Sequence, residues 1–576
     1  MRSEHAPPRI ETSQAGDRHP VHAKPEARAP KSIRTFIRAR PYDLLTCAVF
    51  LALVAAVCLT FKDYAISNDE GVQHHYGELI LTYYRSGFKA RDLFSFDNLY
   101  LYGGLFDIIA VALSHVIPMD AYDLRHILCA MIGIGGIAAS AATARMMAGP
   151  RAGLVAAVAL SLCGAWYGAM FNHTKDIPFA AAMMGATLFL VRIDRQLPSP
   201  RGIDVAAFGL LTGAALGMRS LGLLQLVYLG FAIALHLPWR ERGARPHFAA
   251  SAVLKILPAL VLAWLIMILA WPWAALSPLN PVRGLFAFSQ FDYPIRTMFA
   301  GHVYEMADVP RIYIPVYLLI RVPLVMLAGA ALAMISPFWQ PRGPEKPAQR
   351  RDLGLVSLTI VFPVACQVLV GGPAFTGMRH FLFVLPPLAA LAGVGLSGLV
   401  DALKPKSRRL ATGVVALMGV CFLWDGVPLV RLHPYENLSY NALVGGLPGA
   451  FRRYDMDYWF NSMPEAIHIL EAYVRDNVPV APPKIYSVAV CGERLAFDHV
   501  VTLPQLHWDF RPEWDQSEFF IAPTQMNCDR DLDGKVVGVV KRLGVPIAYV
   551  KDRRAIMKRP VASAGPSLSG QRTNLR

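Results

Sequence analysis

The sequence predicts a polytopic α-helical membrane protein that ends in a small α/β domain. Apolar side chains make up 54% of the 576 residues. They gather in separate runs of roughly 18 to 22 residues, the length with which a helix crosses the hydrocarbon core of a bilayer. The loops between these runs alternate in charge, as loops on the two sides of a membrane do. A soluble protein of this length would not carry so many such runs.

The chain begins with a polar segment and a first span. Residues 1–34 are rich in Pro, Arg, His and Ala and show no periodicity, which predicts a disordered cytoplasmic tail. The first apolar run, 43–61, has no small-residue cleavage site after it. We therefore expect it to stay as an anchor and not to be removed as a signal peptide.

The other apolar runs complete a predicted transmembrane region at residues 35–429. With the first run they make about eleven helices. The further spans are expected at 121–142, 152–169, 178–193, 203–218, 220–237, 250–270, 311–335, 354–371, 380–400 and 410–428.

The charges of the loops orient these spans. Arginine and lysine cluster in every second loop, for example at Arg192, Arg195 and Arg201, which places those loops and the basic N-terminus on the cytoplasmic side. The same rule accounts for the formal net charge of +15. No basic stripe with interleaved aromatic residues is present in the sequence, so we exclude nucleic acid as a partner.

The segment 99–117 decides which loops face outward. It is apolar enough to span, but if it crossed, the basic loops after it would lie outside. It also contains Tyr102-Gly103-Gly104 and Asp107, which suit a helix on the membrane surface. We therefore expect juxtamembrane helices at 70–86 and 104–117 within a large first outer loop.

After residue 429 the chain changes to a mixed polar pattern. It predicts a periplasmic α/β domain at 430–555, followed by a disordered tail at 556–576. A helix is expected at 463–478, and strands at 485–490, 519–522, 536–540 and 546–550. Cys491 and Cys528 fall in this domain, where they either form a disulfide or remain free.

Two adjacent carboxylates follow the first span, in the stretch Ser67-Asn68-Asp69-Glu70-Gly71. One interpretation is structural, because such a stretch caps the start of a helix. The other is functional, because ionisable groups this close to hydrocarbon are costly and are kept for a use. The two interpretations stay open for Asp69 and Glu70 taken alone.

A second charged loop lies on the same predicted side and favours the functional interpretation. It contains His173, Lys175 and Asp176 directly before a span. Lys175 and Asp176 are either an interfacial ion pair or part of a site. Together the two loops offer a carboxylate base and cations for an anionic leaving group, which glycosyl transfer from a lipid phosphate requires.

Three further side chains are expected on the outer side. Arg379 and His380 open the tenth span, and Arg219 lies in a tight turn between the fifth and sixth. Either arginine could simply reach from the span to the membrane surface. Arginine also binds phosphate through two parallel hydrogen bonds, which makes a role at a polyprenyl phosphate plausible.

The sequence resembles the GT-C superfamily of membrane glycosyltransferases, in particular the bacterial members of glycosyltransferase family 39, which are similar to protein O-mannosyltransferases and aminoarabinose transferases. The motifs that carry the resemblance are Asp69-Glu70, Asn172-His173-Thr174-Lys175-Asp176-Ile177-Pro178, Arg379-His380 with Pro386-Pro387, Tyr440 to Gly446, and Tyr454-Asp455-Met456-Asp457-Tyr458-Trp459. The resemblance covers roughly residues 40–475.

The resemblance implies an inverting hexosyl- or pentosyltransferase of a bacterial inner membrane that acts on the periplasmic side. Its donor would be a polyprenyl-phosphate sugar, and its acceptor a lipid, a glycan or a protein. Asp69 would be the base, and Glu70 and Asp176 would shape the acceptor site. A divalent metal, if one takes part, would bind Asp69 and Asp176.

The chain departs from better-known members in two places. No large domain is inserted between the seventh and eighth spans, which weakens the case for a protein acceptor. Where aminoarabinose transferases have a lysine and paired prolines, this chain reads Tyr102-Gly103-Gly104-Leu105. The donor phosphate is therefore expected to bind Lys175, Arg379, Arg219 or the histidines beside them, His173 and His380.

Two other functions remain as alternatives. A transporter or flippase of lipid-linked saccharides would carry its charges at mid-membrane, often beside broken helices. Here the charges lie at the outer ends of the spans, with Arg321 as the exception. A non-catalytic membrane scaffold would tolerate loss of the carboxylates.

Overall fold

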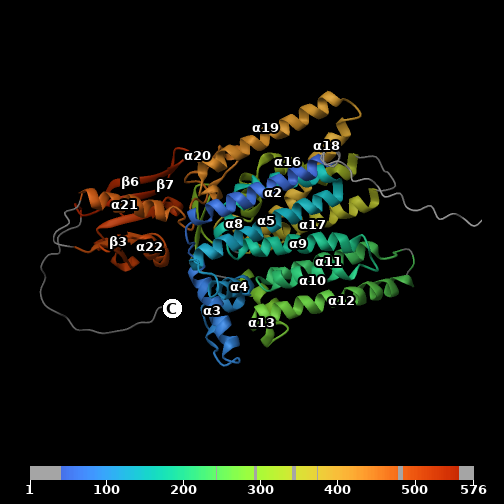
Figure 1. Ribbon diagram of the computed structural model, residues 1–576, viewed down its shortest axis with the longest axis horizontal. Helices are drawn as coiled ribbons and strands as arrows, with labels where there is room; N and C mark the ends of the chain where they lie inside the picture. Colours follow the sequence, from blue (N-terminus) through green and yellow to red (C-terminus); the bar gives the residue numbers. More distant parts are fainter. Residues whose placement is uncertain are drawn as a thin grey trace, which may run out of the picture.

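The computed structural model describes residues 40–239, 241, 243–290, 295–339, 346–372, 374–477 and 484–556. The tails expected at 1–34 and 556–576 lie outside these ranges, except for residue 556. The described chain forms a bundle of apolar helices with an α/β domain at one end (Figure 1).

The helices of the bundle run along the long axis of the molecule (Figure 1). The unbroken ones are α2 Pro41–Thr60, α5 Ala121–Ala148, α9 Asp176–Asp194, α10 Gly202–Leu216, α11 Leu224–His236, α12 Ala244–Ala270, α17 Lys346–Val370, α18 Leu385–Leu403 and α19 Arg408–Leu432. Two more are broken, namely α6 Pro150–Ser161 with α7 Gly164–Tyr167 and α8 Ala169–Asn172, and α15 Tyr313–Arg321 with α16 Leu324–Trp339.

Seven helices in the described ranges are long and apolar enough to cross a membrane, or up to nine if each bent pair counts as one span. The chain is therefore a multi-pass membrane protein. Helices α10 and α11 are apolar but shorter. The total of eleven spans stays a prediction.

The spans at the centre of the bundle are far more buried than the spans at its edge. The span that contains α18 is 89% buried and α9 is 83% buried, whereas α2 is 11% and α19 is 17% buried. The two central helices therefore pack against protein on all sides. The outer ones keep apolar side chains exposed, as expected for helices that face lipid.

The two helices expected in the first outer loop are present as α3 (Glu70–Arg85) and α4 (Leu105–Ser114), at the end of the bundle nearest the α/β domain (Figure 1). The start of α4 is bound to the bundle by two backbone hydrogen bonds. Gly104 N–H donates to the carbonyl oxygen of Ala270, and Leu105 N–H donates to that of Gly217. These bonds fix the first outer loop against α10 and α12.

The C-terminal domain is built on one five-stranded sheet. Its strand order is β4-β3-β5-β7-β6, with β3 parallel to β4 and β5 and the other pairs antiparallel. The strands are β3 Tyr486–Val490, β4 Leu506–Asp509, β5 Phe519–Pro523, β6 Lys535–Arg542 and β7 Val545–Asp552, and helix α21 (Met463–Asn477) packs against the sheet. The structure contains all four predicted strands and the predicted helix.

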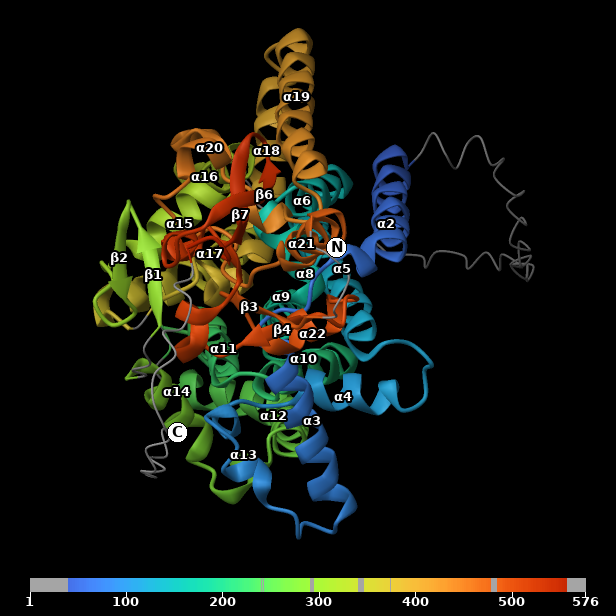
Figure 2. The same cartoon turned by 90° about the vertical axis from the view of Figure 1, so that its left-hand side faces the viewer.

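Several elements of the outer region were not expected from the sequence. Among them are strand β4, the helix α22 (Arg494–Val500), and a hairpin of β1 (Arg296–Phe299) and β2 (His302–Glu305). Cys491 and Cys528 form a disulfide, which settles the question that the sequence left open. Viewed from the domain side, α22 and β4 lie over the end of the bundle near α3 (Figure 2).

Candidate functional site

The two charged loops meet on a single arginine. Asp69 is the last residue before α3, and Asp176 is the first residue of α9. Arg379, which begins the short helix η5 (Arg379–Val384) ahead of α18, lies between them. Its Nη2 is 2.9 Å from Asp69 Oδ2, and its Nε is 3.9 Å from Asp176 Oδ2. Arg379 therefore brings the two charged loops together at the end of the bundle.

Two more cations stand beside this pair. Arg219, at the turn between α10 and α11, forms an ion pair with Asp176. The ammonium of Lys175 lies 4.6 Å from the ring centroid of Tyr102, and the guanidinium of Arg219 lies 5.6 Å from the same ring. The aromatic face therefore holds both cations at the end of the bundle.

Lys175 is the cation in this group that lacks a carboxylate partner. Within the described residues, no acidic oxygen lies within ion-pair distance of its ammonium, and the side chain is buried. Burial lowers the pKa of Lys175, while nearby acids such as Asp107 oppose that shift. Lys175 thus offers an anionic ligand a positive charge that no ion pair among the described residues uses.

The two predicted histidines lie next to this cluster. His173 Nε2 is 3.0 Å from the hydroxyl of Tyr458, and its ring centroid is 3.9 Å from that of Trp459. Burial holds the pKa of His173 well below its usual value, so the imidazole is neutral. His380 Nε2 accepts a hydrogen bond of 3.2 Å from Arg379 Nε. Both rings therefore position their neighbours and carry no charge.

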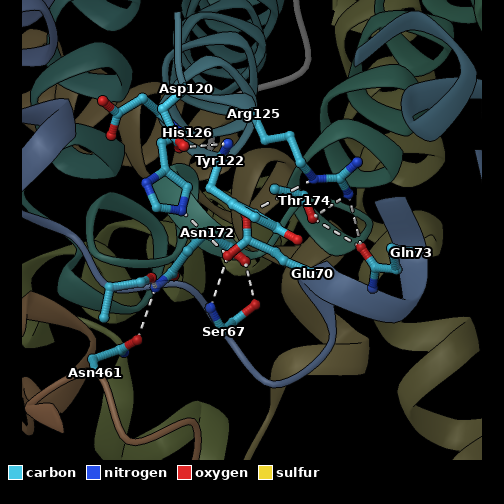
Figure 3. A network of polar contacts seen from close by, with 12 residues as sticks. Ser67, Glu70, Gln73, Asp120, Tyr122, Arg125, His126, Asn172, Thr174 and Asn461 are labelled. Atoms are coloured by element: carbon cyan, nitrogen blue, oxygen red, sulfur yellow. Dashed lines mark hydrogen bonds and ion pairs between the residues drawn. The ribbon is translucent and has the colours of Figure 1, made fainter. Parts of the chain in front are cut away.

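Glu70 does not join the cluster, although it is the neighbour of Asp69. Its side chain is fully buried and points into the bundle (Figure 3). One oxygen accepts a 2.8 Å hydrogen bond from Ser67 N–H and lies 3.2 Å from His126 Nε2, and the other lies 3.9 Å from Arg125 Nε. Glu70 thus connects the start of α3 to α5.

The same buried network holds the second loop in place. Arg125 Nη2 donates to Asp107 at 2.8 Å. It also donates to Thr174 Oγ1 at 3.1 Å, and Thr174 in turn donates to Gln73 (Figure 3). Because Thr174 stands between His173 and Lys175 in the chain, the network fixes the position of the loop. This network therefore supports the site from within the bundle and is not part of the charged cluster itself.

Asn172 ties three segments together. Its Nδ2 donates to Asn461 Oδ1 at 2.8 Å and to the carbonyl oxygen of Ala65 at 3.1 Å, and its carbonyl accepts from Ser67 Oγ (Figure 3). The first loop, the second loop and the segment before α21 are therefore held to one another by a single side chain and its backbone.

Three site residues were not among the predicted ones. Tyr102 faces the cations, the guanidinium of Arg379 lies 4.9 Å from the ring centroid of Trp459, and Glu493 lies near Asp69. Burial and the charge of Asp69 raise the pKa of Glu493. Trp459 ends the motif Tyr454 to Trp459, so the sequence did offer a signal for it. Nothing in the sequence indicated Glu493.

The two carboxylates do not fit a divalent metal between them. The guanidinium of Arg379 occupies the position that a bridging cation would take, and Arg219 neutralises Asp176 from another side. Among the described residues, one group of ligand-type side chains is close enough to share an ion, Cys491, Cys528 and Asp531. Its two cysteines are joined in the disulfide.

No protein-family model matches the chain, and no curated protein matches it. Among solved structures, it is similar to ArnT from Cupriavidus metallidurans bound to undecaprenyl phosphate, with a TM-score of 0.46, 15% identity, and coverage of 92% of this chain and 99% of that one. It is also similar to the archaeal oligosaccharyltransferase AglB from Archaeoglobus fulgidus in complex with an inhibitory peptide and a dolichol-phosphate. That match has a TM-score of 0.45 and 11% identity, and covers 85% of this chain and 70% of that one.

Proposed function

We propose that the protein is an inverting glycosyltransferase that moves one sugar from a polyprenyl-phosphate donor to an acceptor on the periplasmic side of a bacterial inner membrane. One observation carries the proposal: Arg379 joins Asp69 and Asp176 at the end of the bundle, with Arg219 and Lys175 beside them. A carboxylate and buried cations are the two things that this transfer needs.

A difference in exposure supports different roles for the two carboxylates. The side chain of Asp69 keeps 34% of its surface exposed, whereas that of Asp176 keeps 5%. Only Asp69 is open to an incoming hydroxyl group, so we assign it as the base. Asp176, paired with Arg219, positions the arginines.

In the proposed reaction, Asp69 takes the proton of the acceptor hydroxyl, and that oxygen attacks the anomeric carbon of the sugar. The bond between this carbon and the phosphate oxygen breaks, and the phosphate leaves with the electron pair. Lys175 and Arg379 would stabilise its growing negative charge, since fixed cations in a dry site act strongly on developing charge. Attack from the face opposite the phosphate inverts the anomeric centre.

The proposal is tested by offering the purified protein defined polyprenyl-phosphate sugars together with membrane extract as acceptor, and by mass spectrometry of the product. We expect one sugar to be added per turnover. Asp69→Asn should reduce the rate by at least about 100-fold, the usual effect of losing a general base. Its unfolding temperature should match that of the unsubstituted protein.

Asp92→Asn is the matched control, because Asp92 is an exposed carboxylate in the same outer loop. It should leave turnover unchanged. Transfer that continues at full rate in Asp69→Asn would disprove the assignment of the base. Movement of intact donor across vesicles without any product would favour the transporter instead.

A further inference from the structure

A cavity of about 280 Å³ lies where α15 ends beside α19 and the segment 439–448, and its lining does not include Asp69, Asp176, Arg379, Arg219 or Lys175. In Figure 1 this region is where α20 (Gly446–Ala450) meets the end of α19. Its lining includes Arg321, Asp425, Trp424 and Tyr440. The proposed transfer uses none of these four side chains.

The cavity exists because a proline breaks a predicted span. Pro323 forces the preceding residue, Val322, into an extended conformation (φ −88°, ψ 138°), so α15 ends at Arg321. The helices α15 and α16 diverge by 115°. Asn441 closes the broken end by donating to the carbonyl oxygens of Leu319 at 2.7 Å and Val322 at 2.8 Å. The wall of the cavity is therefore held by hydrogen bonds.

Arg321 brings a buried positive charge to this cavity. Only 7% of the residue is exposed, its guanidinium lies 4.6 Å from the ring centroid of Tyr440, and it donates to the carbonyl oxygen of Asn437. In the described part of the chain, no carboxylate lies within ion-pair distance and Nε has no hydrogen-bond partner. Burying a guanidinium without an anion costs free energy. A negatively charged ligand bound at this site would offset that cost.

Asp425 brings a negative charge to the same cavity from the side of α19. The described residues offer it no hydrogen bond and no ion pair. A carboxylate in an apolar helix is costly unless it has a partner. The cavity therefore presents one cation and one anion that do not pair with each other, an arrangement that suits a ligand with both charges.

We propose that this cavity binds the headgroup of a zwitterionic phospholipid of the phosphoethanolamine type. The phosphate would bind Arg321 and the ammonium would bind Asp425. The outer surface of α19 explains why the ligand is a lipid, because Trp424 is 74% exposed and Val427 is 57% exposed beside the cavity. Acyl chains would lie along these side chains, which a soluble headgroup would leave uncovered.

The test uses the full-length protein in lipid nanodiscs and native mass spectrometry to count the phospholipids that stay bound. We expect phosphatidylethanolamine to be retained in preference to phosphatidylglycerol. Arg321→Gln should reduce retention of both lipids by about tenfold or more, because both lose the charge-assisted bonds to phosphate. Asp425→Asn should keep the lipid and lose the preference. This second variant keeps the test decisive if Arg321→Gln fails to fold.

Arg409→Gln, an exposed cation near the other end of α19, is the control and should retain lipid normally. Unchanged retention in Arg321→Gln, or an unchanged preference in Asp425→Asn, would overturn the proposal. Displacement of the lipid by undecaprenyl phosphate would also overturn it, since the cavity would then belong to the donor. Equal competition by soluble glycerophosphoethanolamine would refute the lipid assignment.

Discussion

Asp69 and Glu70 are adjacent in the chain but point into different surroundings. Successive side chains at the start of a helix point about 100° apart, because a helix has 3.6 residues per turn. Asp69 therefore meets Arg379 at the open end of the bundle, and Glu70 enters the buried network with Arg125 and His126. The pair looks like a catalytic dyad in the sequence, but the structure separates the two roles.

This separation predicts opposite effects of two conservative substitutions. Glu70→Gln removes a buried negative charge that faces Arg125 and His126. We expect it to lower the free energy of unfolding by about 1–3 kcal/mol, whereas Asp69→Asn should change it by less than about 0.5 kcal/mol. Thermal unfolding of both variants in detergent measures this. A Glu70→Gln protein that is fully stable yet inactive would show that Glu70 has a catalytic role.

The geometry of Arg379 predicts that lysine cannot replace it. The planar guanidinium reaches Asp69 and Asp176 at once, whereas an ammonium is a single point of charge. Arg379→Gln should slow transfer by about 100-fold or more, as does the loss of other fixed donors to a developing charge. Arg379→Lys should recover part of this rate and raise KM for the donor. Steady-state kinetics against donor concentration separates the two effects.

Arg85→Lys is the control for this pair, since Arg85 is exposed at the far end of α3. It should behave like the unsubstituted protein. Full activity of Arg379→Lys would mean that charge alone matters and that bridging the carboxylates does not.

At the scale of elements, the start of α4 depends on a glycine. A Cβ atom at Gly103 would lie 2.0 Å from the carbonyl oxygen of Gly217, which is backbone and cannot turn away. Gly103→Ala should therefore push the first outer loop off α10 and lower stability by about 1–3 kcal/mol, as overpacking does. Transfer should fall as well, because Tyr102 is the neighbouring residue and faces Lys175.

Gly135→Ala is the matched control for this prediction. Gly135 lies in α5, and a Cβ atom there meets nothing within 4 Å. Alanine should be neutral or stabilising, by up to about 1 kcal/mol, because it restricts the unfolded chain. The unfolding temperatures of Gly103→Ala and Gly135→Ala, measured under the same conditions, test this prediction. Equal temperatures would show that the loop adapts to the extra methyl group.

The helical elements could be predicted because membrane spans have one dominant signal, a long apolar run. The breaks within them were missed. The run 311–335 is mainly apolar, yet Pro323 divides it into α15 and α16. The proline itself was the available signal. Strand β4, Leu506–Asp509, has four residues, which is the shortest run over which an apolar and polar alternation can indicate a strand.

The candidate site could be predicted in part for a similar reason. Charges at the ends of apolar runs are conspicuous, which pointed to Asp69, Asp176 and Arg379. The inward turn of Glu70 is a consequence of helical phase, and the approach of Glu493 depends on how a separate domain docks. Neither contact is encoded in local sequence, so neither could be found by reading along the chain.

At the scale of the whole molecule, the α/β domain is attached to the bundle by specific contacts. Leu495 of α22 is so close to Gly71 of α3 that a Cβ atom there would lie 2.6 Å from it. The Cys491–Cys528 disulfide lies in this domain and requires an oxidising compartment. The proposed periplasmic location would provide such a compartment.

His433 connects the end of α19 to the end of the first span, and it makes the stability of the protein depend on pH. It follows α19, and its ring nitrogens lie 2.8 Å from Glu436 Oε1 and 3.0 Å from Asp63 Oδ2, which lies just after α2. The hydrogen bond to Glu436, with that to Asp63, raises the pKa of His433 in spite of partial burial. The folded protein therefore favours the charged imidazolium. This stabilisation is fully present below the unfolded pKa of about 6.5 and is lost as pH rises through the raised folded value.

His433→Gln should accordingly cost about 1 kcal/mol of stability at pH 6, the size of a partly exposed ion pair, and much less at pH 9. Unfolding temperatures at the two pH values measure the difference. His468→Gln, an exposed histidine on α21, should show no such dependence. His433→Gln could instead lose the same stability at both pH values. The contacts of His433 would then stabilise the protein through packing, without any contribution from its charge.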